Sequence, residues 1–385
     1  MRFFTTALSF ALLAISALGA VTPLHTIERF NGATTGRFIV KAKDGVSKDK
    51  LLAKVGSSVT HNWEILNGFA ANLDDTTLNF LRASPDVEFV AEDGIMHTMT
   101  TQTNAPWGIA RLSSNTRLAN QDSSALTFSY TFDASAGSGV DIYIVDTGVL
   151  TTHTQFGGRA TWGATFGPYA DRDGNGHGTH CAGTAAGSQF GVAKAANIIA
   201  VKVLSDAGSG AVSDIVSGLN FVLSSARASG RPSIVSMSLG GGVSTSLDNA
   251  VASLTNAGIH VAVAAGNSNA DAANTSPARA PSANTVGAST IADARASFSN
   301  FGAVVDIFAP GQNVISAWIR SNTDTNNISG TSMATPHVAG LIAYLIRLQG
   351  NITPAAMSTK LKNLSLKGVL TGIPSGTLND LAHNA

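Results

Sequence analysis

The stretch that organises this chain is residues 330–340, which read Gly-Thr-Ser-Met-Ala-Thr-Pro-His-Val-Ala-Gly and lead into an apolar run over residues 341–346. The polar start, the proline in the first turns and Gly350 beyond the run predict a buried helix that begins at or near Ser332. A serine at a helix start lies among unpaired backbone N–H groups, where the helix dipole favours negative charge. Ser332 is therefore a candidate nucleophile, although serine is also a favoured N-cap residue.

Two further stretches of the chain contain candidate catalytic side chains. Residues 140–148 read Val-Asp-Ile-Tyr-Ile-Val-Asp-Thr-Gly and place Asp146 at the end of an apolar strand. Residues 173–183 read Asp-Gly-Asn-Gly-His-Gly-Thr-His-Cys-Ala-Gly and contain His177. With Ser332 they supply a carboxylate, an imidazole and a hydroxyl in the order Asp, His, Ser, which is the order known from subtilisin. Only proximity in space would make them a catalytic triad.

On these motifs the chain resembles the subtilases, and most closely their secreted proteinase K-like branch, over almost its whole length after the leader. The resemblance implies a serine endopeptidase in which Ser332 is the nucleophile, His177 the general base and Asp146 the residue that orients the imidazole. Residues 264–267, Ala-Ala-Gly-Asn, match the stretch that ends in the family's oxyanion residue, here Asn267. Taken alone, an asparagine after a glycine is more often a turn residue.

The resemblance also implies where a peptide substrate binds. The residues that it places along the peptide are Ser238, Leu239, Gly240, Ala264, Ala265, Gly266, Gly208, Ser209 and Gly210. Small, uncharged walls predict a pocket that accepts large apolar or aromatic side chains before the scissile bond and discriminates weakly among them. The segment Gly208–Gly210 is expected to pair with the substrate as an added strand, or else to be a flexible linker.

One structural calcium ion is expected from the same resemblance. Asp306, with the carbonyl groups of Pro281 and Ala283, matches the strong calcium site of the family branch, and water would complete the shell. The alternative is a solvated aspartate at a strand end. A second, weaker site is not expected, because residues 367–370, Lys-Gly-Val-Leu, lack the aspartate that it uses. No catalytic metal is expected.

Other metal sites are disfavoured by spacing. His177, His180 and Cys181 lie too close together for a closed four-ligand zinc site, and the chain contains no other cysteine. Residues 171–176 imitate the start of an EF-hand loop, but its twelfth position is Ala182 instead of glutamate. His180 and His337 are expected to be structural, and Cys181 to be a small buried hydrophobe.

The fold expected for the larger part of the chain is α/β, a three-layer parallel sheet with helices on both faces. Candidate strands are rich in valine and isoleucine, as buried parallel strands are, and they alternate with helical stretches. The expected strands are residues 140–145, 197–203, 233–238, 259–264, 285–288 and 304–308. The expected helices are residues 212–228 and 247–256, the helix at His177, the helix at Ser332 and one after Pro354.

Three segments are expected along the chain: a signal peptide over residues 1–20, an inhibitory propeptide over 21–99 and the peptidase domain over 100–385. The leader has Arg2 before an apolar stretch and small residues at its end. The second segment has a βαββαβ pattern with a hairpin at Asn67-Gly68, typical of a small α+β domain. Its tail, residues 93–99, would lie in the active-site cleft, with cleavage near Met99-Thr100 or alternatively at His97-Thr98.

Composition narrows the possible partners. The formal net charge is zero, 44% of residues are hydrophobic and 12% are charged, so a large core is expected and nucleic acid is an improbable partner. No later segment reaches membrane-spanning length. We expect an exported, extracellular, monomeric protein without a membrane anchor, acting on proteins and peptides and inhibited by its own propeptide. N-glycosylation sequons occur at Asn274, Asn327, Asn351 and Asn363.

Three alternatives were weighed against this interpretation. A sedolisin-type acid peptidase would need a glutamate in the catalytic set, and every glutamate lies before residue 100. A lipase or esterase would need glycine two residues after the nucleophile, where Ala334 stands. An inactive binding protein with the same fold would typically have lost a member of the set formed by Asp146, His177, Ser332 and Asn267, and all four are present.

Overall fold

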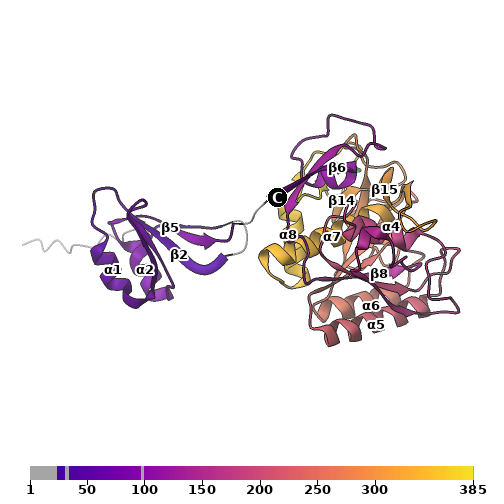
Figure 1. The fold of residues 1–385 in the computed structure, drawn as a ribbon, viewed down its shortest axis with the longest axis horizontal. Helices are drawn as coiled ribbons and strands as arrows, with labels where there is room; N and C mark the ends of the chain where they lie inside the picture. Colours follow the sequence, from indigo (N-terminus) through magenta and orange to yellow (C-terminus); the bar gives the residue numbers. More distant parts are fainter. Residues whose placement is uncertain (1–23, 31–33, 97–98, 385) are drawn as a thin grey trace, which may run out of the picture. The chain divides into compact units, whose positions relative to one another are not determined.

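The computed structural model describes residues 24–30, 34–96 and 99–384 (Figure 1). The described residues form two compact units, one up to Ile95 and one from Met96 onward. The signal peptide expected over residues 1–20 lies outside the described residues, as do His97 and Thr98.

The described residues of the N-terminal unit form a five-stranded sheet, in the order β1-β5-β2-β4-β3, with two α-helices and one short 3-10 helix. Its elements are β1 (Ile27–Glu28), β2 (Thr34–Ala42), α1 (Asp49–Val55), η1 (Gly56–Ser58), β3 (Val59–Trp63), β4 (Gly68–Ala71), α2 (Asp75–Ala83) and β5 (Val87–Gly94). Asn67 adopts a φ of 46°, which lets β3 turn back into the antiparallel β4. The expected βαββαβ order is confirmed, with the short β1 added parallel to β5.

The larger unit contains a nine-stranded sheet in the order β17-β18-β14-β13-β12-β11-β8-β10-β9. All neighbours from β14 to β9 are parallel. Its strands are β8 (Asp141–Asp146), β9 (Ala160–Thr165), β10 (Asn197–Lys202), β11 (Ser233–Met237), β12 (His260–Ala264), β13 (Asn284–Ser289), β14 (Ile307–Pro310), β17 (Leu366–Lys367) and β18 (Asp380–Leu381). The expected parallel sheet is confirmed.

Helices cover both faces of this sheet because its strands are apolar on both sides. In β8, Ile142 and Ile144 join the core under one face, whereas Tyr143 and Val145 join the core under the other. The first core also contains residues of α4 (His177–Ala186), α7 (Thr331–Gln349) and α8 (Pro354–Leu364). The second contains residues of α5 (Val212–Ser229) and α6 (Thr245–Asn256). Figure 1 shows these two helix layers on either side of β8.

Several shorter elements were not expected from the sequence. They are η1, the strands β9, β17 and β18 of the large sheet, and also β6 (Met99–Ala105), α3 (Trp107–Leu112), β7 (Phe128–Asp133), η2 (Thr154–Phe156), η3 (Ala272–Asn274), β15 (Val314–Ala317) and β16 (Thr325–Ile328). The pairs β6–β7 and β15–β16 each form a two-stranded antiparallel sheet. Among the described helices, none is long and apolar enough to span a membrane.

The parallel strands place their carboxyl ends along one edge of the sheet, where ligands of open α/β sheets bind. Asp146 ends β8, Ser238 follows β11, and the loop containing Asn267 follows β12. The neighbouring order β12-β11-β8-β10 brings these loops together.

Candidate active site

Asp146 and His177 form a direct pair. Asp146 is fully buried at the end of β8, and His177 is the first residue of α4. The His177 Nδ1 atom lies 2.8 Å from Asp146 Oδ1 and 2.9 Å from Oδ2. Because Asp146 Oδ1 also accepts a hydrogen bond from the Thr147 N–H at 2.7 Å, the carboxylate is held from both sides. The carboxylate thereby fixes the proton on Nδ1 and leaves Nε2 of a neutral imidazole as a base.

The charge environment of His177 favours its protonated form. Burial lowers its pKa, but the charge and hydrogen bond of Asp146, with a weaker contribution from Asp173, raise it, and the pKa lies above the ordinary value. The His177 side chain is nevertheless 26% exposed, whereas that of Asp146 is not exposed at all. The imidazole can therefore exchange protons with a molecule in the cavity while its partner stays out of reach of water.

The start of α4 is organised by the buried carboxylate of Asp173. Its Oδ1 accepts from the N–H groups of Asn175 (3.0 Å) and Gly176 (2.8 Å) and from the Thr147 hydroxyl (3.0 Å). Its Oδ2 accepts from the Thr179 N–H (3.0 Å) and hydroxyl (2.6 Å). A carboxylate at this helix start satisfies N–H groups that have no partner within the helix. Through Thr147, the same group connects the end of β8 to the start of α4.

Thr147 is held a second time on its carbonyl side. The ammonium group of Lys202, which is buried on β10, donates to the Thr147 carbonyl at 2.6 Å and to Asp206 Oδ1 at 2.8 Å. The residue after Asp146 is therefore fixed through its hydroxyl by Asp173 and through its carbonyl by Lys202. This arrangement limits movement of the Asp146 backbone relative to His177.

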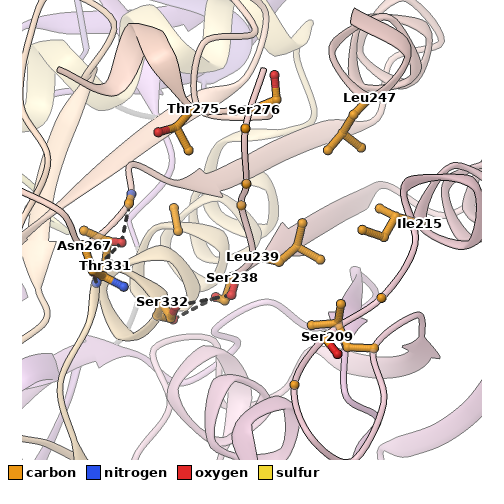
Figure 2. Close-up of a pocket in the computed structure, with 18 of the residues that line it drawn as sticks. Ser209, Ile215, Ser238, Leu239, Leu247, Asn267, Thr275, Ser276, Thr331 and Ser332 are labelled. Atoms are coloured by element: carbon orange, nitrogen blue, oxygen red, sulfur yellow. Dashed lines mark hydrogen bonds between the residues drawn. The ribbon is translucent and has the colours of Figure 1, made fainter. Parts of the chain in front are cut away.

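Ser332 is the second residue of α7, as the sequence predicted to within one residue. Its hydroxyl donates to the Ser238 carbonyl at 3.2 Å, and its own carbonyl accepts from the Ser238 hydroxyl at 2.7 Å. Figure 2 shows these reciprocal contacts between Ser332 and Ser238. The hydroxyl therefore points toward Ser238 in this structure, and rotation about χ1 of Ser332 is needed to turn it toward His177. Catalytic hydrogen bonds are often absent or long before substrate is bound.

Asn267 has a fixed amide orientation. Its Oδ1 accepts from the N–H of Thr331 at 2.8 Å and from the Thr331 hydroxyl at 2.9 Å. A backbone N–H can only donate, so the atom that faces it must be the oxygen. The Nδ2 donor is consequently left on the side of the cavity, next to the start of α7 (Figure 2).

These groups line one cavity of about 640 Å³. Of the residues expected to bind substrate, Ser238, Leu239, Gly240, Ala264, Gly266, Gly208, Ser209 and Gly210 line it together with His177, Asn267 and Ser332. Ala265 does not, because it packs in a separate core with Val305 and Phe308. Alternation along the strand end turns Ala264 and Gly266 to the cavity and Ala265 away from it.

Sequence reasoning missed much of the cavity wall. The further lining residues are Thr147, Asn175, Leu204, Val212, Ile215, Gly241, Gly242, Ser244, Leu247, Ser268, Thr275, Ser276, Asn300 and Thr331. Figure 2 shows Leu239, Ile215 and Leu247 together, on the side away from Asn267. The apolar positions of α5 and α6 were visible in the sequence, but only the packing of those helices shows which of them reach the cavity.

The two histidines that were expected to be structural, His180 and His337, have backbone partners. His180 is buried, its Nε2 lies 3.0 Å from the Val314 carbonyl, and burial lowers its pKa to about 3. His337 is also buried, with Nδ1 2.9 Å from the Met333 carbonyl and a pKa lowered by burial to about 4. Both residues are therefore neutral and outside the cavity wall.

Asp146, His177 and Cys181 offer possible metal-ligand atoms within 4.8 Å of one another. The chemistry of this trio argues against a metal. Burial raises the pKa of Cys181 well above its ordinary value, and its Sγ donates to the Ser332 carbonyl at 3.5 Å. The His177 Nδ1 proton is engaged with Asp146. A metal would need to displace both protons.

The carboxylate expected to bind calcium has other partners. Asp306 lies just before β14, where its Oδ2 accepts from the Thr285 N–H at 2.9 Å and its Oδ1 pairs with the Lys362 ammonium at 2.7 Å. Both oxygens are thus engaged by donors of the chain. The ammonium neutralises the carboxylate that a calcium ion would need as its charged ligand, so Asp306 as it is paired here does not fit a calcium ion.

Comparison with known proteins agrees with this geometry. A sequence profile described as the Subtilase family matches residues 137–377, and one described as Peptidase inhibitor I9 matches residues 35–99. The chain is 48% identical over 356 residues to the cuticle-degrading protease of Metarhizium anisopliae, covering 90% of this chain and 89% of that protein. It is 47% identical over 369 residues to Proteinase R of Parengyodontium album, covering 94% and 92%.

A solved structure shows the same fold. The crystal structure of a cold-adapted subtilisin-like serine proteinase superimposes with a TM-score of 0.66 at 43% sequence identity, covering 73% of this chain and 99% of that one. The profile match alone spans more than half of the 385 residues. The chain therefore belongs to the subtilase family and is a subtilisin-like serine endopeptidase with an inhibitor-type propeptide.

Proposed function

We propose that the protein cleaves peptide bonds with Ser332 as nucleophile, His177 as general base, Asp146 as the group that orients His177, and Asn267 as an oxyanion donor. The observation that carries this assignment is the Asp146–His177 pair at 2.8 Å, which opens into the same cavity as Ser332 and Asn267. All four residues lie within residues 137–377, which the family profile matches, and the chain order Asp, His, Ser is the order known from subtilisin.

The proposed reaction begins when the Ser332 hydroxyl turns from the Ser238 carbonyl to His177 Nε2. The imidazole takes the hydroxyl proton while Oγ attacks the carbonyl carbon of the substrate. His177 then gives this proton to the nitrogen of the leaving amine, and the C–N bond breaks to leave an ester on Ser332. Water, deprotonated by His177, attacks the ester, and the proton returns to Ser332 as the acid leaves. Asp146 stabilises the imidazolium of His177 both during formation of the ester and during its hydrolysis.

The negative charge that develops on the substrate oxygen would be met by two donors. One is Nδ2 of Asn267, whose orientation is fixed because Thr331 holds the other end of the amide. The other is the Ser332 N–H, which belongs to the unpaired first turn of α7. Donors that are fixed before the reaction cost no reorganisation in the transition state.

We propose that large apolar or aromatic side chains are preferred before the scissile bond. Leu239 and the small residues Gly240, Ala264 and Gly266 line the cavity without charge, and Leu204, Ile215 and Leu247 extend its apolar side. Gly208, Ser209 and Gly210 also line the cavity, and an extended peptide could add a strand along this segment. A charged side chain in this cavity would be desolvated without a partner.

The N-terminal unit is proposed to inhibit the enzyme and to be removed by self-cleavage near Met99-Thr100. The match to the inhibitor profile ends at residue 99, which supports this boundary between a propeptide of residues 21–99 and a peptidase of residues 100–385. Met99 begins β6 and is 59% exposed, so the bond is near the surface of its unit. With the proposed removal of residues 1–20, the product would be an extracellular monomer.

Replacement of Ser332 by alanine tests the assignment. We expect the full chain with Ser332→Ala to fold, to stay at the length of the precursor and to leave casein uncleaved, because the nucleophile is absent. The matched control is Ser238→Ala, which removes the hydroxyl that contacts Ser332 and leaves the nucleophile in place. Casein cleavage by Ser332→Ala within tenfold of the parent would show that another residue is the nucleophile.

A further inference from the structure

Asp306, the carboxylate expected to bind calcium, forms an ion pair with a lysine. Lys362 extends from the last turn of α8, and its Nζ lies 2.7 Å from Asp306 Oδ1. The side chains of Lys362 and Asp306 are 32% and 22% exposed, so the pair is partly sheltered from water. The other carboxylate oxygen accepts the Thr285 N–H, and the Asp306 N–H donates back to the Thr285 carbonyl at 2.9 Å.

The position of the ammonium group is fixed by the packing of its helix. Leu361, the residue before Lys362, is buried in the core that α8 shares with α7. The Lys362 carbonyl accepts from the hydroxyl of Ser365 at 2.7 Å and from the ammonium of Lys367, which also pairs with Asp380 at 2.6 Å. The end of α8 is therefore anchored, and the ion pair ties it to the loop before β14 and to the start of β13.

Charge and coordination decide between the two cations. Calcium takes six to eight oxygen ligands and draws its affinity from the number of carboxylates around it. Asp306 is the one carboxylate of the expected site, and a singly charged ammonium already neutralises it. A divalent ion beside both groups would leave an excess of positive charge and would face the ammonium at short range. Binding would require Lys362 to leave its partner.

We propose that the Lys362 ammonium replaces calcium at Asp306, so that this region is held together by an internal ion pair and needs no bound metal. The family commonly uses structural calcium, and this chain would obtain the same cross-connection from α8. The proposal concerns stability and does not depend on which residue is the nucleophile.

The test uses the full chain with Ser332→Ala as the background, so that self-cleavage cannot affect unfolding. Thermal unfolding of the larger unit is followed by calorimetry in millimolar calcium and in excess chelator. Six proteins are compared: the background alone, the background with Lys362→Met, Lys362→Arg, Lys360→Met or Asp306→Asn, and the background with both Lys362→Met and Asp306→Asn. Methionine keeps the apolar stem of the lysine without its charge, and arginine keeps the charge. Lys360 lies on the same helix and serves as the matched control.

We expect the background, Lys362→Arg and Lys360→Met to unfold at the same temperature in calcium and in chelator. Lys362→Met should unfold roughly 2–4 °C lower in chelator, a shift typical of losing one contact in a domain of this size. Calcium should restore that loss by binding the folded state at the vacated carboxylate. Adding Asp306→Asn to Lys362→Met should abolish the response to calcium.

Two results would overturn the proposal. One is a calcium-dependent unfolding temperature in the background that disappears with Asp306→Asn, because the carboxylate would then bind calcium despite Lys362. The other is a Lys362→Met protein that responds to calcium no more than the background does, because removal of the ammonium would then have created no metal site.

Discussion

The carboxylate of Asp173 offers a demanding test of how the site is assembled. Asp173 touches neither the cavity nor Ser332, yet it accepts hydrogen bonds from both segments that present Asp146 and His177. The substitution Asp173→Asn keeps the size of the side chain and removes its charge. It therefore separates the effect of a fixed negative charge from the effect of filled space.

The expected loss of stability in Asp173→Asn follows from the hydrogen bonds that the two carboxylate oxygens of Asp173 accept. Asparagine can keep its carbonyl toward Thr147, Asn175 and Gly176, but its NH₂ group then faces the Thr179 N–H, which loses its acceptor. A buried N–H without a partner costs about 1–3 kcal/mol. We expect a fall in the unfolding temperature of roughly 2–10 °C for a domain of this size. Looser positioning of His177 should lower kcat by about 10–100-fold with little change in KM.

The pH profile gives a readout that loss of stability alone would not move. His177 must be neutral to accept the proton of Ser332, and the Asp173 charge contributes to raising the His177 pKa. Removing that charge should lower this pKa and shift the acid limb of kcat/KM to lower pH. Asp171→Asn is the control, since Asp171 is exposed, lies two residues away and accepts a hydrogen bond from the Thr165 hydroxyl. An acid limb that stays in place, or that moves equally in the control, would refute the role given to Asp173.

The other predictions concern the oxyanion donor, the thiol and the propeptide. Asn267→Ala should lower kcat by about 10²–10³-fold at nearly constant KM, as loss of one oxyanion donor does in subtilisin; a change in KM alone would contradict that role. Iodoacetamide should leave peptide hydrolysis unchanged because Cys181 is buried and its thiol stays protonated, and complete inactivation with Ser332 unmodified would indicate a thiol enzyme. The isolated fragment of residues 21–99 should inhibit the mature enzyme at micromolar concentration in initial-rate assays, whereas an inert fragment and unimpaired refolding without it would argue against an inhibitory propeptide.

The sequence predicted the reacting groups better than the cavity around them. Asp146, His177, Ser332 and Asn267 occur in long motifs, and those motifs carry their own local structure: a strand end, two helix starts and a turn. The cavity wall depends on the packing of α5 and α6 against the sheet, and no motif records it. Ala265 illustrates the limit, because a matching stretch of three residues does not tell which of them face outward.

The calcium expectation at Asp306 stays a prediction, and the structure adds a competing partner that the sequence did not show. Asp306 lies in the loop before β14, and its partner Lys362 is on α8, 56 positions later in the sequence. A charge partner at that separation becomes visible only after α8 has packed. The role of Asp173 was also not visible in the sequence. Its five hydrogen bonds connect Thr147 after β8 to the start of α4, and a linear motif does not record such contacts.

Among the elements of the fold, those built on apolar periodicity were predictable. The strands β8, β10, β11, β12 and β13 and the helices α5, α6, α7 and α8 lie where valine, isoleucine and leucine patterns place them, whereas β14 begins three residues later than expected and the outer strands β9, β17 and β18 were not expected. The antiparallel pairs β6–β7 and β15–β16 were not expected, because strands such as Thr-Asn-Asn-Ile over 325–328 carry little apolar alternation. Pairing with a neighbouring strand, and not local propensity, sets their conformation.

The most direct test of the central claim is to identify the residue that reacts as nucleophile. The active protein is treated with a serine-directed organophosphonate, digested and mapped by mass spectrometry, alongside a His177→Ala variant. We predict a single modified residue, Ser332, together with loss of activity in proportion to labelling, and almost no labelling of His177→Ala because the base is missing. Labelling of another residue, or equal labelling of Ser332 in both proteins, would contradict the proposed triad.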